Sequence, residues 1–320
     1  MRTRPVVDRS LSGPPAAAAT GAAAASAPVV APAEGLARIR DLLALGGVAV
    51  LSGAGLSTES GIPDYRGATG SLRRHTPMTY QEFVSDEAGR RRYWARSHVG
   101  WRTIARAQPN AGHRAVQALR ARGHVCAVIT QNVDGLHHAA GTIDAVELHG
   151  GLDRVICLDC GQLSGREELD QRLHAANGPL QAAGAQVNPD GDVELAPELV
   201  DTFRVAPCLA CGGVLKPDVV FFGENVPRAR VDHCFELVDT ASALLVLGSS
   251  LTVMSGLRFV RRAAKAGLPV AIVNHGPTRG DEHAGVRVDL PLGEALTRLA
   301  QELGARPASS AAPVEDLPPS

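Results

Sequence analysis

Residues 48–66 read VAVLSGAGLSTESGIPDYR, and they carry the clearest indication of the fold class. A short apolar run at residues 48–51 leads directly into Ser52-Gly53-Ala54-Gly55. An apolar strand that ends in a glycine-rich turn is typical of nucleotide-binding α/β sheets, because glycines let a pyrophosphate approach the backbone. The stretch therefore predicts a buried strand with a phosphate-binding turn at its carboxyl end.

The sequence on both sides of this stretch alternates between helix-like and strand-like patterns. Four apolar residues fall at helical spacing before a glycine pair: Leu36, Ile39, Leu42 and Leu43. Three further apolar runs are residues 125–129, 243–247 and 270–273. Such runs, apolar on both faces, belong in a parallel sheet covered by helices on each side. We therefore expect a Rossmann-like, doubly wound α/β domain built from residues 34–152 and 214–304.

The composition is that of a globular protein with almost no net charge. Of the 320 residues, 45% are hydrophobic and 20% are charged, and the formal net charge is -1. This composition allows a sizeable core. The near-neutral charge gives no general attraction to nucleic acid, and no run approaches the roughly 20 apolar residues of a membrane span. We therefore expect neither nucleic acid nor a membrane as a partner.

Both ends of the chain are rich in alanine, proline and serine. Residues 1–33 lack the leucine-rich run of a secretory signal and hold too little apolar surface to fold. We predict a disordered tail there, in preference to a transit peptide, and a second tail at residues 305–320. The expected location is the cytoplasm of a bacterium, or the mitochondrial matrix if the source is eukaryotic.

Four of the six cysteines form two C-x-x-C pairs: Cys157 with Cys160, and Cys208 with Cys211. Four thiolates make a closed tetrahedral set suited to one structural zinc ion. A thioredoxin-like redox site is the poorer interpretation, because neither pair opens a helix. We expect residues 153–213 to form a small inserted zinc domain. Residues 63–108 are expected to form helices and a loop that cover the cleft between this domain and the α/β domain. The remaining cysteines, Cys126 and Cys234, are predicted to be buried thiols.

The glycine turn by itself is weak evidence for a dinucleotide site. The third glycine of the dehydrogenase pattern G-x-G-x-x-G is replaced here by Thr58. No second strand ends in Asp or Glu about 20 residues further on, where a ribose-binding carboxylate belongs. An ordinary dehydrogenase is therefore disfavoured.

The longer motif is far more specific. Residues 53–66 (GAGLSTESGIPDYR) resemble the signature loop of sirtuins, the NAD-dependent protein deacylases. Four further segments resemble the other sirtuin motifs in family order: residues 130–137 (TQNVDGLH), 147–150 (ELHG), 248–250 (GSS) and 273–274 (VN). The resemblance covers residues 34–303 and implies NAD as cofactor, with an inserted structural zinc module.

The resemblance assigns the residues that would bind NAD. In the first motif they are Gly53, Ala54, Gly55, Ser57, Thr58, Ile62, Pro63, Asp64, Tyr65 and Arg66. In the later segments they are Gln131, Asn132, Val133, Asp134, His149, Gly248, Ser249, Ser250, Asn274, His275, Gly276 and Leu292. By this resemblance Asp64, Asn132 and Asp134 hold the nicotinamide and its ribose, which Gln131 also touches. Arg66 would help to hold a phosphate, and Ser249 and Asn274 the adenosine half.

His149 and Asn132 are the predicted catalytic residues. Taken alone, a histidine at the end of an apolar strand is more often structural, and Asn132 and Asp134 also suit a turn. A neutral imidazole that titrates near pH 7 is able to take a proton from a ribose hydroxyl, and His149 matches the sirtuin H-G motif. His137 and His138 are predicted to make helix and loop contacts.

The resemblance implies a deacylation that consumes NAD. The carbonyl oxygen of an acyl-lysine attacks the ribose carbon as nicotinamide leaves, and His149 then activates a ribose hydroxyl that receives the acyl group. Water finally releases free lysine and 2′-O-acyl-ADP-ribose. The expected partners are therefore proteins that carry acyl-lysine.

Several segments resemble class II sirtuins, a branch linked to lipoamide removal, ADP-ribosyl transfer and the removal of bulky or acidic acyl groups. They are residues 92–96 (RYWAR), 215–224 (LKPDVVFFGE) and 274–279 (NHGPTR). An extended edge that pairs with the substrate backbone is expected from Val219, Val220, Phe222, Gly223 and Glu224. Tyr93 and Arg96 match the spacing of a pair that binds an acyl carboxylate in desuccinylating sirtuins, although a solvated arginine in a basic helix is an equal alternative.

Two other functions are compatible with parts of the sequence. Protein mono-ADP-ribosyltransferase or lipoamidase activity would use the same scaffold. A zinc-ribbon binding module without catalysis would explain the cysteine pairs, but it explains neither the glycine loop nor His149. The net charge of -1 also gives it no general basic footprint for nucleic acid.

Overall fold

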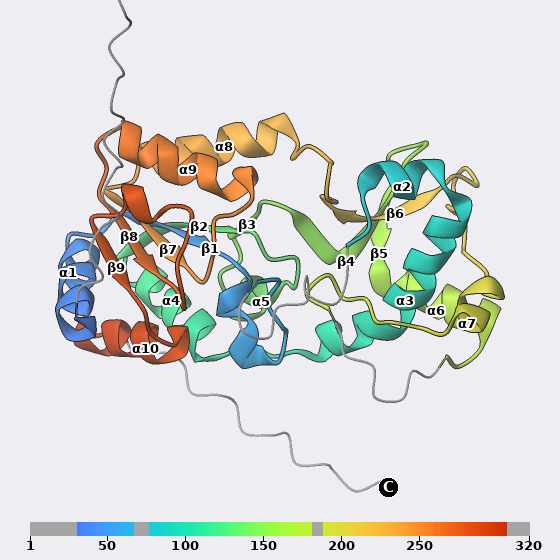
Figure 1. Cartoon of the computed structure of the whole chain (residues 1–320), viewed down its shortest axis with the longest axis horizontal. Helices are drawn as coiled ribbons and strands as arrows, with labels where there is room; N and C mark the ends of the chain where they lie inside the picture. The colour runs from blue at the N-terminus through green and yellow to red at the C-terminus, as the bar shows by residue number, and fades with distance from the viewer. Residues whose placement is uncertain (1–30, 67–76, 181–187, 306–320) are drawn as a thin grey trace, which may run out of the picture.

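Six parallel strands form the larger of two sheets in the computed structural model, which describes residues 31–66, 77–180 and 188–305 (Figure 1). The strand order is β3-β2-β1-β7-β8-β9, and every neighbouring pair is parallel. The strands are β1 (Val48–Ser52), β2 (Val125–Thr130), β3 (Val146–Glu147), β7 (Ala243–Leu247), β8 (Val270–Val273) and β9 (Val286–Val288). The order reverses between β1 and β7, so the carboxyl ends of these strands form the crevice at which open α/β sheets bind ligands.

Helices cover both faces of this sheet, because its strands are apolar on both faces. In β1, Val48 and Val50 pack on one side of the sheet, and Ala49 and Leu51 pack on the other. The first face is covered by α1 (Pro32–Ala44), α4 (Ala111–Ala121) and α10 (Leu292–Glu302), and the second by α8 (Arg228–Asp239) and α9 (Met254–Lys265) (Figure 1). The predicted doubly wound α/β fold is confirmed.

A second, antiparallel sheet of order β5-β4-β6 forms the centre of a smaller module. Its strands are β4 (Gly150–Cys157), β5 (Leu163–Gly165) and β6 (Leu215–Val219). The helices around it are α2 (Tyr80–Ser85), α3 (Glu87–Arg106), α6 (Arg166–Asn177) and α7 (Pro197–Asp201) (Figure 1). One apolar cluster joins Phe83 of α2, Trp94 of α3 and Leu169 of α6. Helices α2 and α3, from the predicted excursion, therefore pack with the inserted segment; residues 67–76 of that excursion lie outside the described residues.

Some local features differ from the sequence-based expectations. Helix α1 begins at Pro32, so the last residues of the predicted tail already belong to a helix. Residues 1–30 of that tail, and residues 306–320, lie outside the described residues. Strand β9 has only three residues. Such a short strand contains no apolar run long enough to predict it from the sequence. Cys234 is buried as predicted, but the prediction for Cys126 is wrong, since its thiol is exposed and reaches the Gly47 carbonyl near the start of β2.

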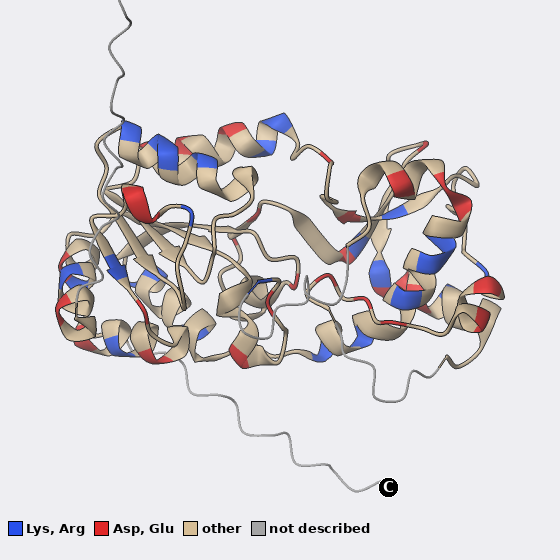
Figure 2. Ribbon diagram, in the orientation of Figure 1, with Lys and Arg blue, Asp and Glu red and all other residues tan. Residues whose placement is uncertain are grey.

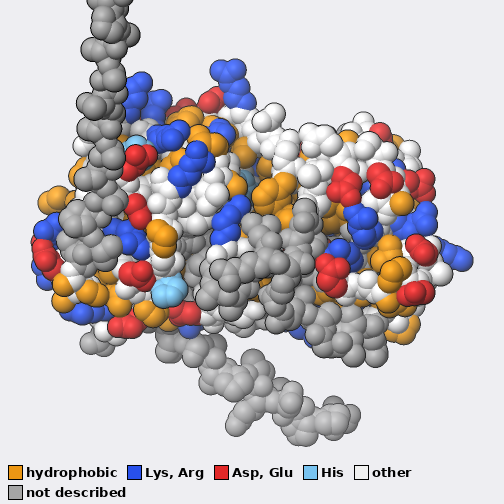
Figure 3. All heavy atoms as spheres, in the orientation of Figure 1, with side chains coloured by type: hydrophobic (Ala, Val, Ile, Leu, Met, Phe, Trp, Pro, Cys, Tyr) orange, Lys and Arg blue, Asp and Glu red, His pale blue; other side chains and the backbone are white. Residues whose placement is uncertain are grey.

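Charged side chains of both signs are spread over the two modules. Basic residues gather along α8 and α9, where acidic residues also occur (Figure 2), and the Arg262 guanidinium of α9 lies 2.6 Å from Asp239 of α8. The space-filling view shows basic and acidic side chains interspersed on one face (Figure 3). Such mixing favours short-range ion pairs over one long-range field. Within the described residues, none of the helices combines the length and the apolar character that crossing a membrane requires.

A pair of buried histidines lies beneath the glycine turn. The rings of His113 in α4 and His137 in α5 (Leu136–Ala139) are 5.0 Å apart. The His113 Nδ1 accepts from the Asn110 N–H in the capping box of α4, and the His137 Nε2 lies 2.9 Å from the Ser52 hydroxyl. Burial lowers the pKa of His113 from 6.5 to about 4, and it lowers the pKa of His137 well below 6.5. Both rings are therefore neutral at pH 7.

We predict that this pair makes the fold sensitive to acid. The folded chain holds His113 neutral, so the unfolded chain takes up one more proton between pH 6.5 and about 4, and stability falls as the pH is lowered through that window. The full pKa shift of His113 corresponds to about 3 kcal/mol in the free energy of unfolding. Urea denaturation at neutral pH and near pH 4.5 should show this loss, and His113→Asn, which keeps an acceptor but does not titrate, should show a smaller one.

His233→Asn is the matched control, because His233 is an exposed histidine on α8. It should lose as much stability in acid as the wild-type chain. An equal loss in all three proteins would remove His113 as a source of the acid sensitivity.

Candidate active site and metal centre

Two glycine turns meet at the carboxyl ends of β1 and β7. A Cβ atom at Gly55 would lie 2.9 Å from the Gly248 Cα, and one at Gly53 would lie 2.8 Å from the Gly248 carbonyl oxygen. Gly248 itself has a φ of 62°, in the left-handed region that favours glycine. The Gly55 N–H donates to the Gly248 carbonyl oxygen at 2.9 Å. Glycine is therefore required at these positions because the two backbones touch.

A cavity of about 1100 Å³ extends from these turns to the small module. It exceeds the roughly 300–1,000 Å³ of common ligand pockets, and it suits a dinucleotide together with a protein side chain. Its walls contain every predicted cofactor residue except Pro63, and every predicted substrate residue except Arg96. The structure thus brings residues from all five motifs into one cleft.

Asn132, Ser57 and Asp134 form a buried polar chain in the cleft wall. The Asn132 Nδ2 donates to the Gly53 carbonyl oxygen at 3.1 Å and to the Ser57 hydroxyl at 3.0 Å. The Ser57 hydroxyl donates in turn to Asp134 at 2.6 Å. Burial raises the pKa of Asp134, although the Ser57 hydrogen bond opposes this effect. Because the Asn132 amino group is engaged with the glycine loop, its Oδ1 is the atom available for a ligand.

His149 lies in the cleft wall, at the passage from β3 to β4. Its Nδ1 lies 2.9 Å from the Gln131 carbonyl oxygen, and its Nε2 lies 2.9 Å from the Ser255 hydroxyl. A carbonyl oxygen only accepts, so in the neutral ring Nδ1 carries the proton and Nε2 presents a lone pair. Burial lowers the pKa of His149 below 6.5, and the charges of Arg230 and Arg258 act in the same direction. The geometry supplies a base that is neutral at pH 7.

The fifth motif forms a fixed turn after β8. The Asn274 Nδ2 donates to the carbonyl oxygens of His275 and Gly276, at 3.0 and 2.9 Å. Asp289 accepts from the Gly276 N–H and lies 2.9 Å from the His275 Nδ1. These bonds hold the turn in place where it lines the cleft.

The segment after β6 is braced by a buried lysine. The Lys216 Nζ donates to the Val219 carbonyl oxygen at 2.6 Å and to Glu224 at 3.1 Å. The Val220 N–H donates to the His149 carbonyl oxygen at 2.8 Å. The predicted substrate edge is therefore a fixed wall of the cleft directly beside the candidate base.

Tyr93 and Arg96 lie three residues apart on α3, but only Tyr93 lines the cleft. Arg96 is buried, with its guanidinium 3.2 Å from Asp192 and 2.5 Å from Glu194. Two carboxylates thus already balance its charge. The predicted carboxylate receptor is not formed in this structure, because a loop distant in sequence packs its acidic residues against α3.

Sequence reasoning missed several residues of the cleft wall, among them Asp190, Asp192, Ser255 and Arg258. Burial and the neighbouring Asp192 carboxylate raise the pKa of Asp190 to about 8. No motif marks the two aspartates, since tertiary packing alone brings their loop to the cleft. Ser255 comes shortly after the fourth motif, and that closeness is the one sequence signal that points to it.

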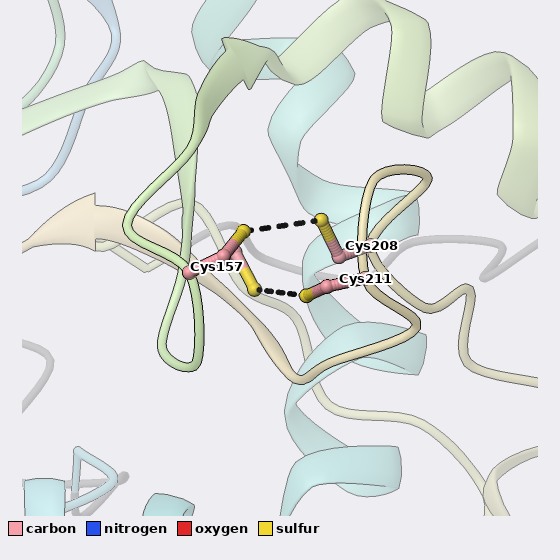
Figure 4. Close-up of side chains that lie close together, drawn as sticks. Cys157, Cys208 and Cys211 are labelled. Atoms are coloured by element: carbon pink, nitrogen blue, oxygen red, sulfur yellow. Dashed lines mark hydrogen bonds between the residues drawn. The ribbon is translucent and has the colours of Figure 1, made fainter.

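Four cysteine sulfurs converge between the end of β4 and the start of β6 (Figure 4). All four lie within 4.8 Å of one another, with 3.5 Å between Cys157 and Cys211 and 3.9 Å between Cys160 and Cys208. Tetrahedral zinc, with bonds of about 2.3 Å, places its sulfur ligands about 3.8 Å apart. The cluster therefore fits one structural zinc ion with no open coordination position.

Known proteins resemble this chain over most of its length. The profile of the Sir2 family matches residues 53–255. A Streptomyces coelicolor protein named NAD-dependent protein deacetylase 1 is 66% identical over 271 residues, which cover 85% of this chain and 91% of that protein. A Mycobacterium avium protein of the same name is 51% identical over 265 residues, covering 81% of this chain and 93% of that protein.

Solved structures share the fold. One described as "Sir2-p53 peptide-NAD+" matches with a TM-score of 0.67 at 29% identity, covering 83% of this chain and 98% of that chain. Another, described as "Sir2 bound to acetylated peptide", matches with a TM-score of 0.66 at 27% identity, covering 84% and 99%.

We predict about one zinc ion per purified chain. Cys157→Ser removes one thiolate from the closed set, so zinc content and the thermal stability of the small module should fall together. Elemental analysis and thermal denaturation measure both quantities. Cys126→Ser, at an exposed thiol outside the cluster, is the matched control and should keep the metal. A chain that keeps its melting temperature after its zinc is chelated would contradict the structural role.

Proposed function

The chain belongs to the Sir2 family, and we propose that it is an NAD-dependent protein-lysine deacylase with His149 as its base. The relatives that resemble it over most of its length are named NAD-dependent protein deacetylases. Acetyl-lysine in proteins is therefore the primary substrate. The acyl group passes to ADP-ribose, and nicotinamide is released.

The placement of His149 carries this proposal. The base lies in one cleft wall with the glycine turns and the substrate edge. The Gln131 carbonyl oxygen holds the His149 Nδ1, and the His149 carbonyl oxygen accepts from the Val220 N–H of that edge. A base fixed between a dinucleotide site and a peptide-binding edge is able to take a proton from a ribose hydroxyl while the acyl-lysine lies alongside. A zinc-binding module without catalysis gives no reason for this arrangement.

The chain supplies the groups that would hold NAD. When bound, NAD provides the ribose carbon that accepts the acyl oxygen, and the nicotinamide that leaves. The glycine turns at Gly53 and Gly248 line the cleft and would lie against the pyrophosphate. Asn132, held by two hydrogen bonds to the glycine loop, orients the nicotinamide ribose through its side-chain oxygen. Ser249 and Asn274 bind the adenosine half.

The charges of the cleft favour uncharged acyl groups. Asp190 and Asp192 share the wall with Tyr93 and Leu152. With its pKa raised to about 8, Asp190 is mostly protonated at pH 7, so the negative charge in this wall is that of the Asp192 carboxylate. Arg96 is already engaged by carboxylates. An acyl chain that ends in its own carboxylate would bring a like charge to this partly buried wall, where repulsion is stronger than in water. Acetyl and longer neutral chains therefore rank above succinyl and glutaryl chains.

Membership of class II extends the proposal to longer neutral chains such as lipoyl. It rests on the resemblance of three segments, at residues 92–96, 215–224 and 274–279, and a cavity of about 1100 Å³ supports it by leaving room beside a dinucleotide. Mono-ADP-ribosyl transfer is the alternative on the same scaffold. The two activities differ in whether ADP-ribose ends on the acyl group or on a protein.

His149→Tyr tests the function most directly. The variant should keep its fold and zinc but lose deacetylation by a factor on the order of 100 or more, because a phenol with a pKa of about 10 is a poor base at neutral pH. Mass spectrometry of an acetyl-peptide reaction with NAD measures deacetylated peptide, nicotinamide and acyl-ADP-ribose. ADP-ribose found on protein, with the acetyl group retained, would select the transferase instead.

The wild-type enzyme should also show the titration of this base. Its kcat/KM should fall only below pH 6.5, because the lowered pKa of His149 keeps the imidazole neutral above that value. A native rate in His149→Tyr would remove His149 from the role of base.

Asp192→Asn tests the charge argument. Removing one negative charge from the wall should raise the succinyl-to-acetyl ratio of kcat/KM by about ten-fold, or ~1.4 kcal/mol. Glu198→Gln, an exposed change on α7 of the same module, is the matched control and should leave the ratio unchanged. A wild-type enzyme that prefers succinyl-lysine to acetyl-lysine would overturn the argument.

A further inference from the structure

Two residues at the start of α9 pack directly against the parts of the site that hold His149. The Ser255 hydroxyl lies 2.9 Å from the His149 Nε2 and lines the cleft. The next residue, Gly256, faces Gln131, because a Cβ atom at Gly256 would lie only 2.4 Å from the Gln131 Oε1. Neither residue belongs to any of the five motifs.

Gln131 links Gly256 to the other nitrogen of the same ring. The Gln131 side chain donates to the Ser249 hydroxyl at 2.8 Å and to the Ser52 carbonyl oxygen at 3.2 Å. Its backbone carbonyl oxygen holds the His149 Nδ1 at 2.9 Å. The start of α9 therefore contacts the surroundings of both ring nitrogens of His149. Ser255 contacts Nε2 directly, and Gly256 packs against Gln131, which holds Nδ1.

The hydrogen-bond pattern determines which group donates. The Gln131 carbonyl accepts the Nδ1 proton, so the Ser255 hydroxyl is the donor to Nε2. The other charges that face the ring are the guanidinium groups of Arg230 on α8 and Arg258 on α9, two helices along which basic residues gather in Figure 2. A cation beside the ring opposes its protonation, and only Ser255 offers Nε2 a neutral partner among the described residues.

We infer that Ser255 is a positioning residue for His149: its hydroxyl holds Nε2 toward the cleft until the ribose hydroxyl takes its place. An imidazole held at one nitrogen is free to turn about χ2, whereas one held at both nitrogens is not. The Ser255 oxygen lies within the hydrogen-bond distance that a hydroxyl must reach to give its proton to the base. The inference rests on the proposed role of His149.

Ser255→Ala tests this role because the positioning acts on one step only. The kcat of deacetylation should fall about 10- to 100-fold, while KM for peptide and NAD, zinc content and melting temperature stay near wild type. Exchange of labelled nicotinamide into NAD should also persist, since in the proposed reaction nicotinamide leaves before the base acts. Ser255→Thr keeps the hydroxyl and should recover most of the rate.

Two further variants separate positioning from general damage. Gly256→Ala forces Gln131 to move, so it should lower kcat and raise KM for NAD together. Ser242→Ala is the matched control, because the Ser242 hydroxyl donates to the Gly46 carbonyl oxygen away from the cleft, and its activity should equal that of wild type.

The outcomes distinguish this inference from the proposed function. If His149→Tyr is inactive but Ser255→Ala keeps the native kcat, the positioning role is wrong and the deacylase proposal stands. If Ser255→Ala loses exchange and deacetylation equally, or if Ser255→Thr restores nothing, Ser255 serves the fold or cofactor binding instead. A His149→Tyr variant that deacetylates at the native rate would contradict both the role of His149 as the base and the positioning role of Ser255.

Discussion

The backbone contact between the turns after β1 and β7 sets the position of everything else in the cleft. Gly55 and Gly248 approach so closely that a Cβ atom on Gly55 would lie 2.9 Å from the Gly248 Cα and force the two turns apart. The end of β2 is built onto this contact: the Gln131 N–H donates to the Ser52 carbonyl oxygen, and the Asn132 side chain donates to the Gly53 carbonyl oxygen. The glycine turn and the Asn132 carboxamide are thus parts of one hydrogen-bonded unit.

The candidate base stands where the chain leaves the large sheet for the small one. Gly150 takes a φ of 82°, and a Cβ atom there would lie 1.9 Å from the Asp218 carbonyl oxygen. Arg154 bridges the two sheets, with its guanidinium 2.7 Å from Glu147 of β3 and 3.1 Å from Asp218 of β6. These contacts fix the backbone that follows His149, while Gln131 and Ser255 hold its ring.

Three arginines whose roles could not be told apart from the sequence have different surroundings in the fold. Arg166 is buried with its guanidinium 4.7 Å from the centre of the Trp101 ring and 5.3 Å from that of Trp94, so it serves as a packed cation within the small module. Arg96 balances acidic residues of a distant loop. Arg258 approaches the cleft and influences the pKa of His149. Burial and partners decide which of these roles an arginine takes.

Features that depend on local patterns of residues were predictable from the sequence. Apolar runs predicted β1, β2, β7 and β8 almost to the residue, because a strand buried on both faces must be apolar throughout. The cysteine spacing predicted the metal cluster, and the predicted cofactor and substrate residues together make up more than half of the cleft wall. Three other features became visible only in the folded chain: Asp192 engages Arg96, α2 and α3 pack in the small module, and Ser255 faces His149. Those contacts join residues far apart in the chain, and no local pattern records which side chains folding will bring within 3 or 4 Å of each other.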